Sequence, residues 1–273
     1  MIAVERSVEL ARERRARWTP FSPVRDAIGA ASRNLIAYRR VPQLLVFSTI
    51  QPVIFVLMFR YVFGGAIQLG AFQYPYVDYL MPGIFAQTVV FGSLAAGIGL
   101  ATDLKSGLLE RFRSLPMARS AVLAGRTIAD LTRNVFVIAL MVLVGFLVGF
   151  NYHTNLFLFV CALLLLLLFG YMLSWIFATV GLLVGDPETA QAAAFPILAP
   201  LVFASSAFVR VETMPWWLRV FARNQPVSQT VDAARALVDG GPTATHLIPA
   251  ILWCVGIIGV FGPLAVRRYR NAV

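Results

Sequence analysis

Six long apolar stretches constrain what this chain can fold into. Each is long enough to cross about 30 Å of hydrocarbon as a helix. Their apolar residues run continuously instead of alternating, which excludes barrel strands. Five stretches contain no charged residue, and the first carries only Arg60, near its end. The stretches cover residues 44–63, 84–101, 134–150, 156–184, 190–209 and 247–266. The sequence therefore predicts an all-α polytopic membrane protein, with a domain of six transmembrane helices over residues 43–273.

Composition excludes the other classes of protein. Apolar residues make up 59% of the chain and charged residues 13%, against about 45–50% and about 25% in soluble globular proteins. The same figures exclude a disordered chain. Cys161 and Cys254 both lie in apolar stretches, which excludes a disulfide framework and a cysteine metal site. We expect no cofactor in this chain.

Basic residues predict the orientation in the membrane. Nine lie in residues 1–43, six in residues 103–133 and three in the C-terminal tail. If both termini are cytoplasmic, 18 of the 23 basic residues lie on that side, as the positive-inside rule requires. Topology thus explains the net charge of +10 better than nucleic-acid binding does. We expect a multi-pass protein of the inner or plasma membrane.

The N-terminal region divides into two predicted segments. Residues 1–22 form a charged cytoplasmic tail without the short apolar segment of a cleavable signal peptide. Residues 23–42 are predicted to form an amphipathic interfacial helix, with Ser22 as N-cap and Pro23 at the first helical position. The alternative is a basic flank that only anchors the chain.

The connection between the second and third stretches, residues 103–133, contains a short amphipathic helix. Its sequence LLERFRSLP, residues 108–116, mixes acidic and basic residues with apolar ones. Simple adhesion to lipid favours uniformly basic residues. A mixed helix suits a groove on a soluble partner, with Phe112 and Leu115 as buried anchors. Composition alone favours the alternative, a solvated positive-inside loop.

The segment 209–247 contains two further short helices. Met214–Ala222 carries Trp216 and Trp217, which suit a membrane interface. Asn224-Gln225-Pro226 breaks this helix, and Val227–Val238 forms the second. Because neither helix is long enough to span, we predict two short external re-entrant half-helices. The alternative is a plain amphipathic external loop.

Several kinds of chemistry are missing from the sequence. No phosphate-binding G-x-x-x-x-G-K-[ST] loop is present, so the chain cannot hydrolyse ATP by that mechanism. Ion-coupled carriers usually need ionisable groups inside the membrane, and we expect no buried carboxylate here. The polar residues within the predicted spans are neutral: Gln51, Gln87, Thr88, Ser93, Ser174, Thr179, Ser205 and Ser206. Such a path fits an amphipathic or lipid-like substrate better than an ion.

Three separated motifs resemble the ABC type-2 exporter permeases, and among them the daunorubicin-resistance (DrrB-like) group. They are Asp103-Leu104 with Gly107 and Glu110-Arg111-Phe112-Arg113-Ser114-Leu115-Pro116; Leu80-Met81-Pro82-Gly83-Ile84; and Met214-Pro215-Trp216-Trp217-Leu218 with Asn224-Gln225-Pro226-Val227-Ser228 and Arg235. The resemblance covers roughly residues 35–265. Gln225 departs from the family's usual Asn-Pro at that position.

The resemblance implies a permease subunit that exports a hydrophobic or amphipathic drug, lipid or glycolipid. It implies a separate ATP-binding subunit carrying ATP and magnesium, a second permease subunit, identical or paralogous, and membrane lipid as partners. ATPase-coupling residues would be Asp103, Lys105, Gly107, Glu110, Arg111, Phe112, Arg113, Leu115 and Pro116. Residues of the external half-helices would be Trp216, Trp217, Asn224, Pro226 and Arg235. The alternatives are a non-transporting membrane scaffold and an ion-coupled carrier.

Overall fold

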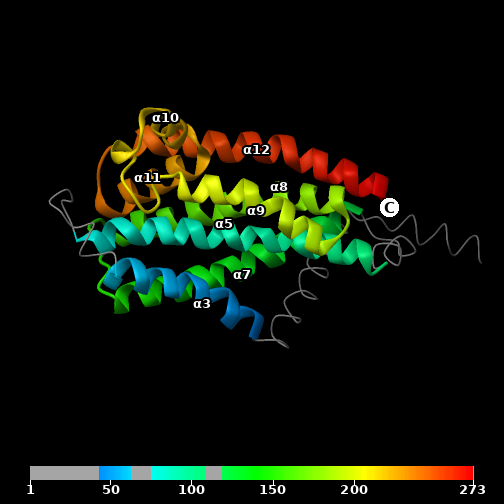
Figure 1. Cartoon of the computed structure of the whole chain (residues 1–273), viewed down its shortest axis with the longest axis horizontal. Coiled ribbons are helices and arrows are strands. Elements are labelled where there is room, and N and C mark those ends of the chain that lie inside the picture. The colour runs from blue at the N-terminus through cyan, green and yellow to red at the C-terminus, as the bar shows by residue number, and fades with distance from the viewer. Residues whose placement is uncertain (1–42, 63–74, 108–118, 273) are drawn as a thin grey trace, which may run out of the picture.

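The computed structural model describes residues 43–62, 75–107 and 119–272, and this part of the chain contains helices and no strand (Figure 1). The predicted interfacial helix over residues 23–42 lies outside the described residues, as does the segment 108–118 with Glu110, Arg111, Phe112, Arg113, Leu115 and Pro116. The helices are α3 (Gln43–Leu57), a π-helix (Met58–Val62), α5 (Tyr76–Lys105), α7 (Arg119–Leu147), α8 (Leu156–Val184), α9 (Pro187–Phe203), a 3-10 helix (Val211–Thr213), α10 (Trp216–Asn224), α11 (Pro226–Asp239) and α12 (Thr243–Ala272).

Four helices in the described part are long and apolar enough to cross a membrane. They cover Tyr76–Lys105, Gly125–Leu147, Leu156–Val184 and Thr243–Tyr269, and they correspond to four of the six predicted spans. The bounds of α8 coincide with the prediction, residues 156–184. The other two predicted spans correspond to shorter helices, α3 and α9, which both contain proline. The chain is therefore a multi-pass membrane protein.

The centre of the bundle is α5, which packs against α3, α7, α8, α9 and α11. The crossing of α5 and α8 depends on two glycines. A Cβ atom at Gly97 would collide with the backbone of Phe177, and one at Gly181 with the carbonyl of Gly97. In Figure 1, α10 and α11 lie at one end of the bundle and the C-terminus at the other. We call these the α11 end and the Lys105 end.

Helix α9 ends before the predicted fifth span does. The apolar stretch continues to residue 209, but α9 ends at Phe203. Hydrogen bonds from side chains replace the backbone hydrogen bonds of the helix there. The side-chain amide of Gln225 donates to the carbonyls of Leu201 and Ala204 at 2.9 and 3.4 Å. The Ser228 hydroxyl accepts from the amide of Ser206 at 3.0 Å. The chain after α9 is therefore attached to the start of α11 instead of continuing the helix.

Two helices also extend beyond the predicted spans and bring carboxylates into the bundle. Asp78 in α5 is 1% exposed and Asp130 in α7 is fully buried, so the expectation of no buried carboxylate is wrong. Both carboxylates have partners. Asp78 accepts from the backbone amide of Asn151 and contacts His153 Nε2, each at 2.9 Å, and Asp130 Oδ2 lies 3.9 Å from Arg126 Nε. The second half of the predicted connection 103–133 likewise belongs to α7, which begins at Arg119.

Candidate functional site

At the Lys105 end, an ion pair joins α5 to α7. Arg126 Nη1 lies 3.1 Å from Asp103 Oδ2, and the two side chains are only 17% and 14% exposed. Arg126 Nε also lies 3.9 Å from Asp130 Oδ2. The guanidinium passes directly across Gly99, where a Cβ atom would occupy the same space. Asp103, predicted to couple to an ATPase, therefore fixes the end of α5 against α7 through a partly buried pair.

A second ion pair joins α5 to the α8–α9 connection. Lys105 Nζ lies 2.6 Å from Asp186 Oδ1, and Asp186 also caps α9 by accepting from the Thr189 amide at 3.0 Å. The hydrogen bond from Lys105, followed by those from Thr189, lowers the pKa of Asp186 to about 2. Gly107, with φ +66°, directly follows the cap of α5. Glycine suits this left-handed position because it has no Cβ atom.

Sequence reasoning missed Arg126 and Asp186. Their partners are 23 and 81 positions away along the chain, so no local pattern pointed to either. The partly buried Asp103–Arg126 pair holds the Lys105 end of α5 to α7, and the more exposed Lys105–Asp186 pair lies beside it. Of the predicted coupling loop, residues 103–133, both ends thus belong to α5 and α7, and residues 108–118 connect them along the chain.

At the α11 end, the two predicted short helices are confirmed as α10 and α11, but they differ in burial. Trp216 and Trp217 on α10 are 78% and 60% exposed, and the exposed Asn224 caps the end of that helix through the Val220 carbonyl at 2.9 Å. Most of α11, which begins at Pro226, is buried. Gln225 closes the turn between them by accepting from the Val227 amide at 3.1 Å. Gln225, the residue that departs from the family pattern, thus shapes the turn between α10 and α11.

Arg235 joins three parts of the α11 end. Its Nε donates to the Tyr79 carbonyl and its Nη2 to the Ala207 carbonyl, both at 2.9 Å. Its Nη1 lies 3.1 Å from Asp232 Oδ1, and its guanidinium lies 3.6 Å from the centre of the Tyr79 ring. Gly83 packs against the same Ala207 carbonyl, because a Cβ atom there would overlap it. Arg235 and Gly83, from two motifs 152 positions apart (235 minus 83), therefore meet at one turn.

A cavity of about 590 Å³ lies beside α11. Its lining carries charges of both signs, including Arg210, Glu212, Asp232 and Asp239. Burial raises the pKa of Asp239 to about 6, and the carboxylate of Asp78 adds to the rise, while His153 and Arg235 oppose it. Asp239 Oδ1 is buried and has no hydrogen-bond partner among the described residues.

Asp239 is expected to make folding pH-dependent. Its pKa is about 6 in the folded chain and about 3.9 in an unfolded one. The stabilisation from holding the proton is therefore complete below about pH 4 and is lost as pH rises through about 6. Asp239→Asn should flatten the dependence of the unfolding temperature on pH in this range. The same substitution should raise the unfolding temperature at neutral pH. Glu212→Gln, at an exposed position, is the control, and equal slopes for Asp239→Asn and the parent would contradict this assignment.

Comparison with known proteins decides the family. A match to the ABC-2 type transporter family covers residues 29–238. The chain is 37% identical to the daunorubicin resistance ABC transporter permease protein DrrB1 of Streptomyces coeruleorubidus, over 97% of this chain and 92% of that protein. The chain belongs to the ABC-2 type transporter family. The doxorubicin resistance permease DrrB of Mycobacterium tuberculosis H37Rv is 30% identical over 66% of this chain and 65% of its own length. The probable doxorubicin resistance permease DrrC of the same strain is 25% identical over 88% and 87%.

Membership of the ABC-2 family assigns this chain the role of membrane permease subunit. It also implies an ATP-binding partner subunit, since the permease itself carries no ATPase site. The two alternatives, a non-transporting scaffold and an ion-coupled carrier, are thereby wrong.

Proposed function

We propose that this ABC-2 permease exports hydrophobic or amphipathic compounds from the cell, as a drug, lipid or glycolipid exporter. The observation that carries the proposal is the similarity over 97% of the chain to a daunorubicin resistance permease. The described helices support it, because they expose many large apolar side chains to their surroundings. A second permease subunit, identical or paralogous, would complete the path through the membrane.

The proposed topology has six spans, with both termini and the Lys105 end in the cytoplasm. It counts α3 and α9 as spans beside the four long helices. Cysteines introduced at Arg268 or Ser106 should then react with a membrane-impermeant maleimide only in inverted vesicles, and cysteines at Asn151 or Gly240 only in intact cells. All four positions are exposed. Labelling of positions 106 and 268 from opposite sides would contradict the six-span arrangement.

We propose that the segment 108–118 docks on the ATP-binding subunit. The Asp103–Arg126 pair supports this, because it is partly buried and joins the ends of α5 and α7 from which the segment extends. Motion of the segment would then pass to α5, α7 and α9 together. Trp216, Trp217, Asn224, Pro226 and Arg235 would shape the opposite, external end of the path.

Reconstitution with the ATP-binding subunit tests both proposals. The parent complex in liposomes should hydrolyse ATP and move a fluorescent anthracycline, whereas Phe112→Ala, Glu110→Arg or Arg113→Glu should reduce the affinity of the two subunits about tenfold or more, or separate hydrolysis from transport. A tenfold loss corresponds to about 1.4 kcal/mol. Arg268→Gln, at an exposed position on α12, is the control. If all three variants assemble and transport like the parent, the segment is a solvated loop.

A further inference from the structure

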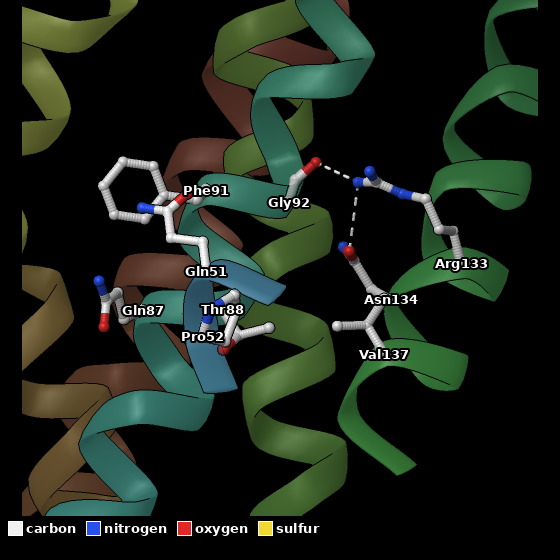
Figure 2. Close-up of a pocket in the computed structure, with 9 residues that line it drawn as sticks. All are labelled: Gln51, Pro52, Gln87, Thr88, Phe91, Gly92, Arg133, Asn134 and Val137. Atoms are coloured by element: carbon white, nitrogen blue, oxygen red, sulfur yellow. Dashed lines mark hydrogen bonds between the residues drawn. The ribbon is translucent and has the colours of Figure 1, made fainter. Parts of the chain in front are cut away.

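A small cavity with several polar side chains in its lining lies between α3, α5 and α7 (Figure 2). Its volume is about 130 Å³. Gln51 contributes from α3, Gln87 and Thr88 from α5, and Arg133 and Asn134 from α7. Residue 133 is the midpoint of α7, which runs from residue 119 to 147. The cavity is therefore remote from both ends of the helices that line it.

Several polar atoms around this cavity have no partner in the described part of the chain. Gln87 and Asn134 are each 3% exposed. Gln87 Oε1, Asn134 Nδ2 and Arg133 Nε are buried and make no hydrogen bond with the described residues. Buried polar groups are almost always hydrogen-bonded in folded proteins, so a cluster of three such atoms needs an explanation. A bound ligand with acceptor oxygens would supply partners for the two donors, Asn134 Nδ2 and Arg133 Nε.

The charge of the cavity indicates the kind of ligand. Arg133 Nη2 donates to the Gly92 carbonyl and lies 3.4 Å from Asn134 Oδ1, as the dashed lines in Figure 2 show. Among the described residues, no carboxylate lies within ion-pair distance of Arg133. Arg133 lies within Gly125–Leu147, a helix long and apolar enough to span a membrane, and a guanidinium inside such a helix is costly and marks a functional site by default. The cavity therefore favours an anion and disfavours an amine.

Gly92 keeps the space that this arrangement needs. A Cβ atom there would collide with Asn134 Oδ1 and approach the Arg133 guanidinium. A larger residue at position 92 would therefore displace the polar pair of α7. The cavity reaches the surface at Gln51, which is exposed beside Ile50 and Ile54 on α3. An apolar tail attached to a ligand in the cavity would lie along these side chains.

We propose that the cavity binds the carboxylate or phosphate headgroup of an amphipathic molecule. The headgroup oxygens accept from Arg133 and from the amide of Asn134, while the tail lies outside on α3. At about 130 Å³ the cavity is smaller than the roughly 300–1,000 Å³ of pockets that enclose drug-sized ligands, so it suits a headgroup better than a whole molecule of that kind. This inference rests on the proposed function in one respect, namely that the bound amphiphile is also a substrate for export.

Binding to the purified full-length chain in neutral nanodiscs tests the site without the ATP-binding subunit. The probe is pyrenedecanoic acid, and pyrenedecanol is its uncharged match. Arg133→Gln should weaken binding of the acid about tenfold or more and leave binding of the alcohol unchanged. Arg133→Lys should lose less affinity for the acid than Arg133→Gln. Arg268→Gln, which removes an exposed arginine, should bind the acid like the parent. Unfolding temperatures close to that of the parent show that the variants are folded.

Three results would overturn the site: equal binding of acid and alcohol by the parent, unchanged binding of the acid by Arg133→Gln, or an equal loss in Arg268→Gln. Competition distinguishes the sources of the headgroup. Phosphatidic acid or oleate should displace the probe, and displacement by millimolar acetate or phosphate alone would show a site for free anions instead. Acid-stimulated ATPase activity of the assembled complex should disappear in Arg133→Gln. If it persists while binding is lost, the cavity is not on the export path, although the proposed export function itself stands.

Discussion

Replacing Arg235 with leucine is expected to lower the free energy of unfolding by about 3–5 kcal/mol. The side chain is 10% exposed and donates to the carbonyls of Tyr79 and Ala207 while pairing with Asp232. Leucine would leave these acceptors without their charged donor and remove the cation–π contact with Tyr79. The turn after α9 would then lose its attachment to α5 and α11.

Thermal and denaturant unfolding of the chain in detergent measures this effect. Arg235→Lys should be intermediate, because an ammonium keeps the charge but lacks the planar fork that reaches three acceptors. Arg223→Leu is the matched control: its ion pair with Glu212 is exposed, 57% and 56%, and such pairs contribute about 0–1 kcal/mol. A loss at Arg235 no larger than that at Arg223 would show that the turn is held by other contacts.

Replacing Arg126 with leucine is the second large change, with an expected loss of about 3–5 kcal/mol. The guanidinium lies between Asp103 and the fully buried Asp130, so leucine would remove the positive charge from between two carboxylates. We expect α5 and α7 to separate at the Lys105 end. In the reconstituted complex, ATP hydrolysis should then continue without transport, because the predicted coupling segment would extend from unfixed helix ends.

Combined variants separate the charge effect from general damage at this position. Arg126→Leu with Asp103→Asn and Asp130→Asn removes all three charges and should recover part of the lost stability, since the uncompensated carboxylates are gone. Arg268→Leu, at an exposed position on α12, controls for loss of an arginine from the same end. If Arg126→Leu unfolds and transports like the parent, the Asp103–Arg126 pair has no role in fixing α5.

Much of the fold could be predicted from the sequence, because a membrane helix satisfies its own backbone. The bounds of α8 followed directly from its apolar stretch, and the breaks around Asn224-Gln225-Pro226 predicted two separate short helices. Hydropathy failed where side chains from elsewhere end or extend a helix. Gln225 and Ser228 end α9 before its apolar stretch is finished, and α7 begins well before its own.

The sequence by itself determined that this chain lies in a membrane, that it is helical, and that it belongs with exporter permeases. Only the tertiary structure decided which charges pair. Arg235 reaches a carbonyl 156 positions away and Arg126 a carboxylate 23 positions away. It also decided that Arg133 and Asn134 line a cavity with Gln51 and Gln87. The reason is physical: hydropathy and periodicity report what one helix does with its own backbone and with lipid. Partners across the bundle depend on how closely α5 packs with its neighbours, which glycines such as Gly97 and Gly181 permit.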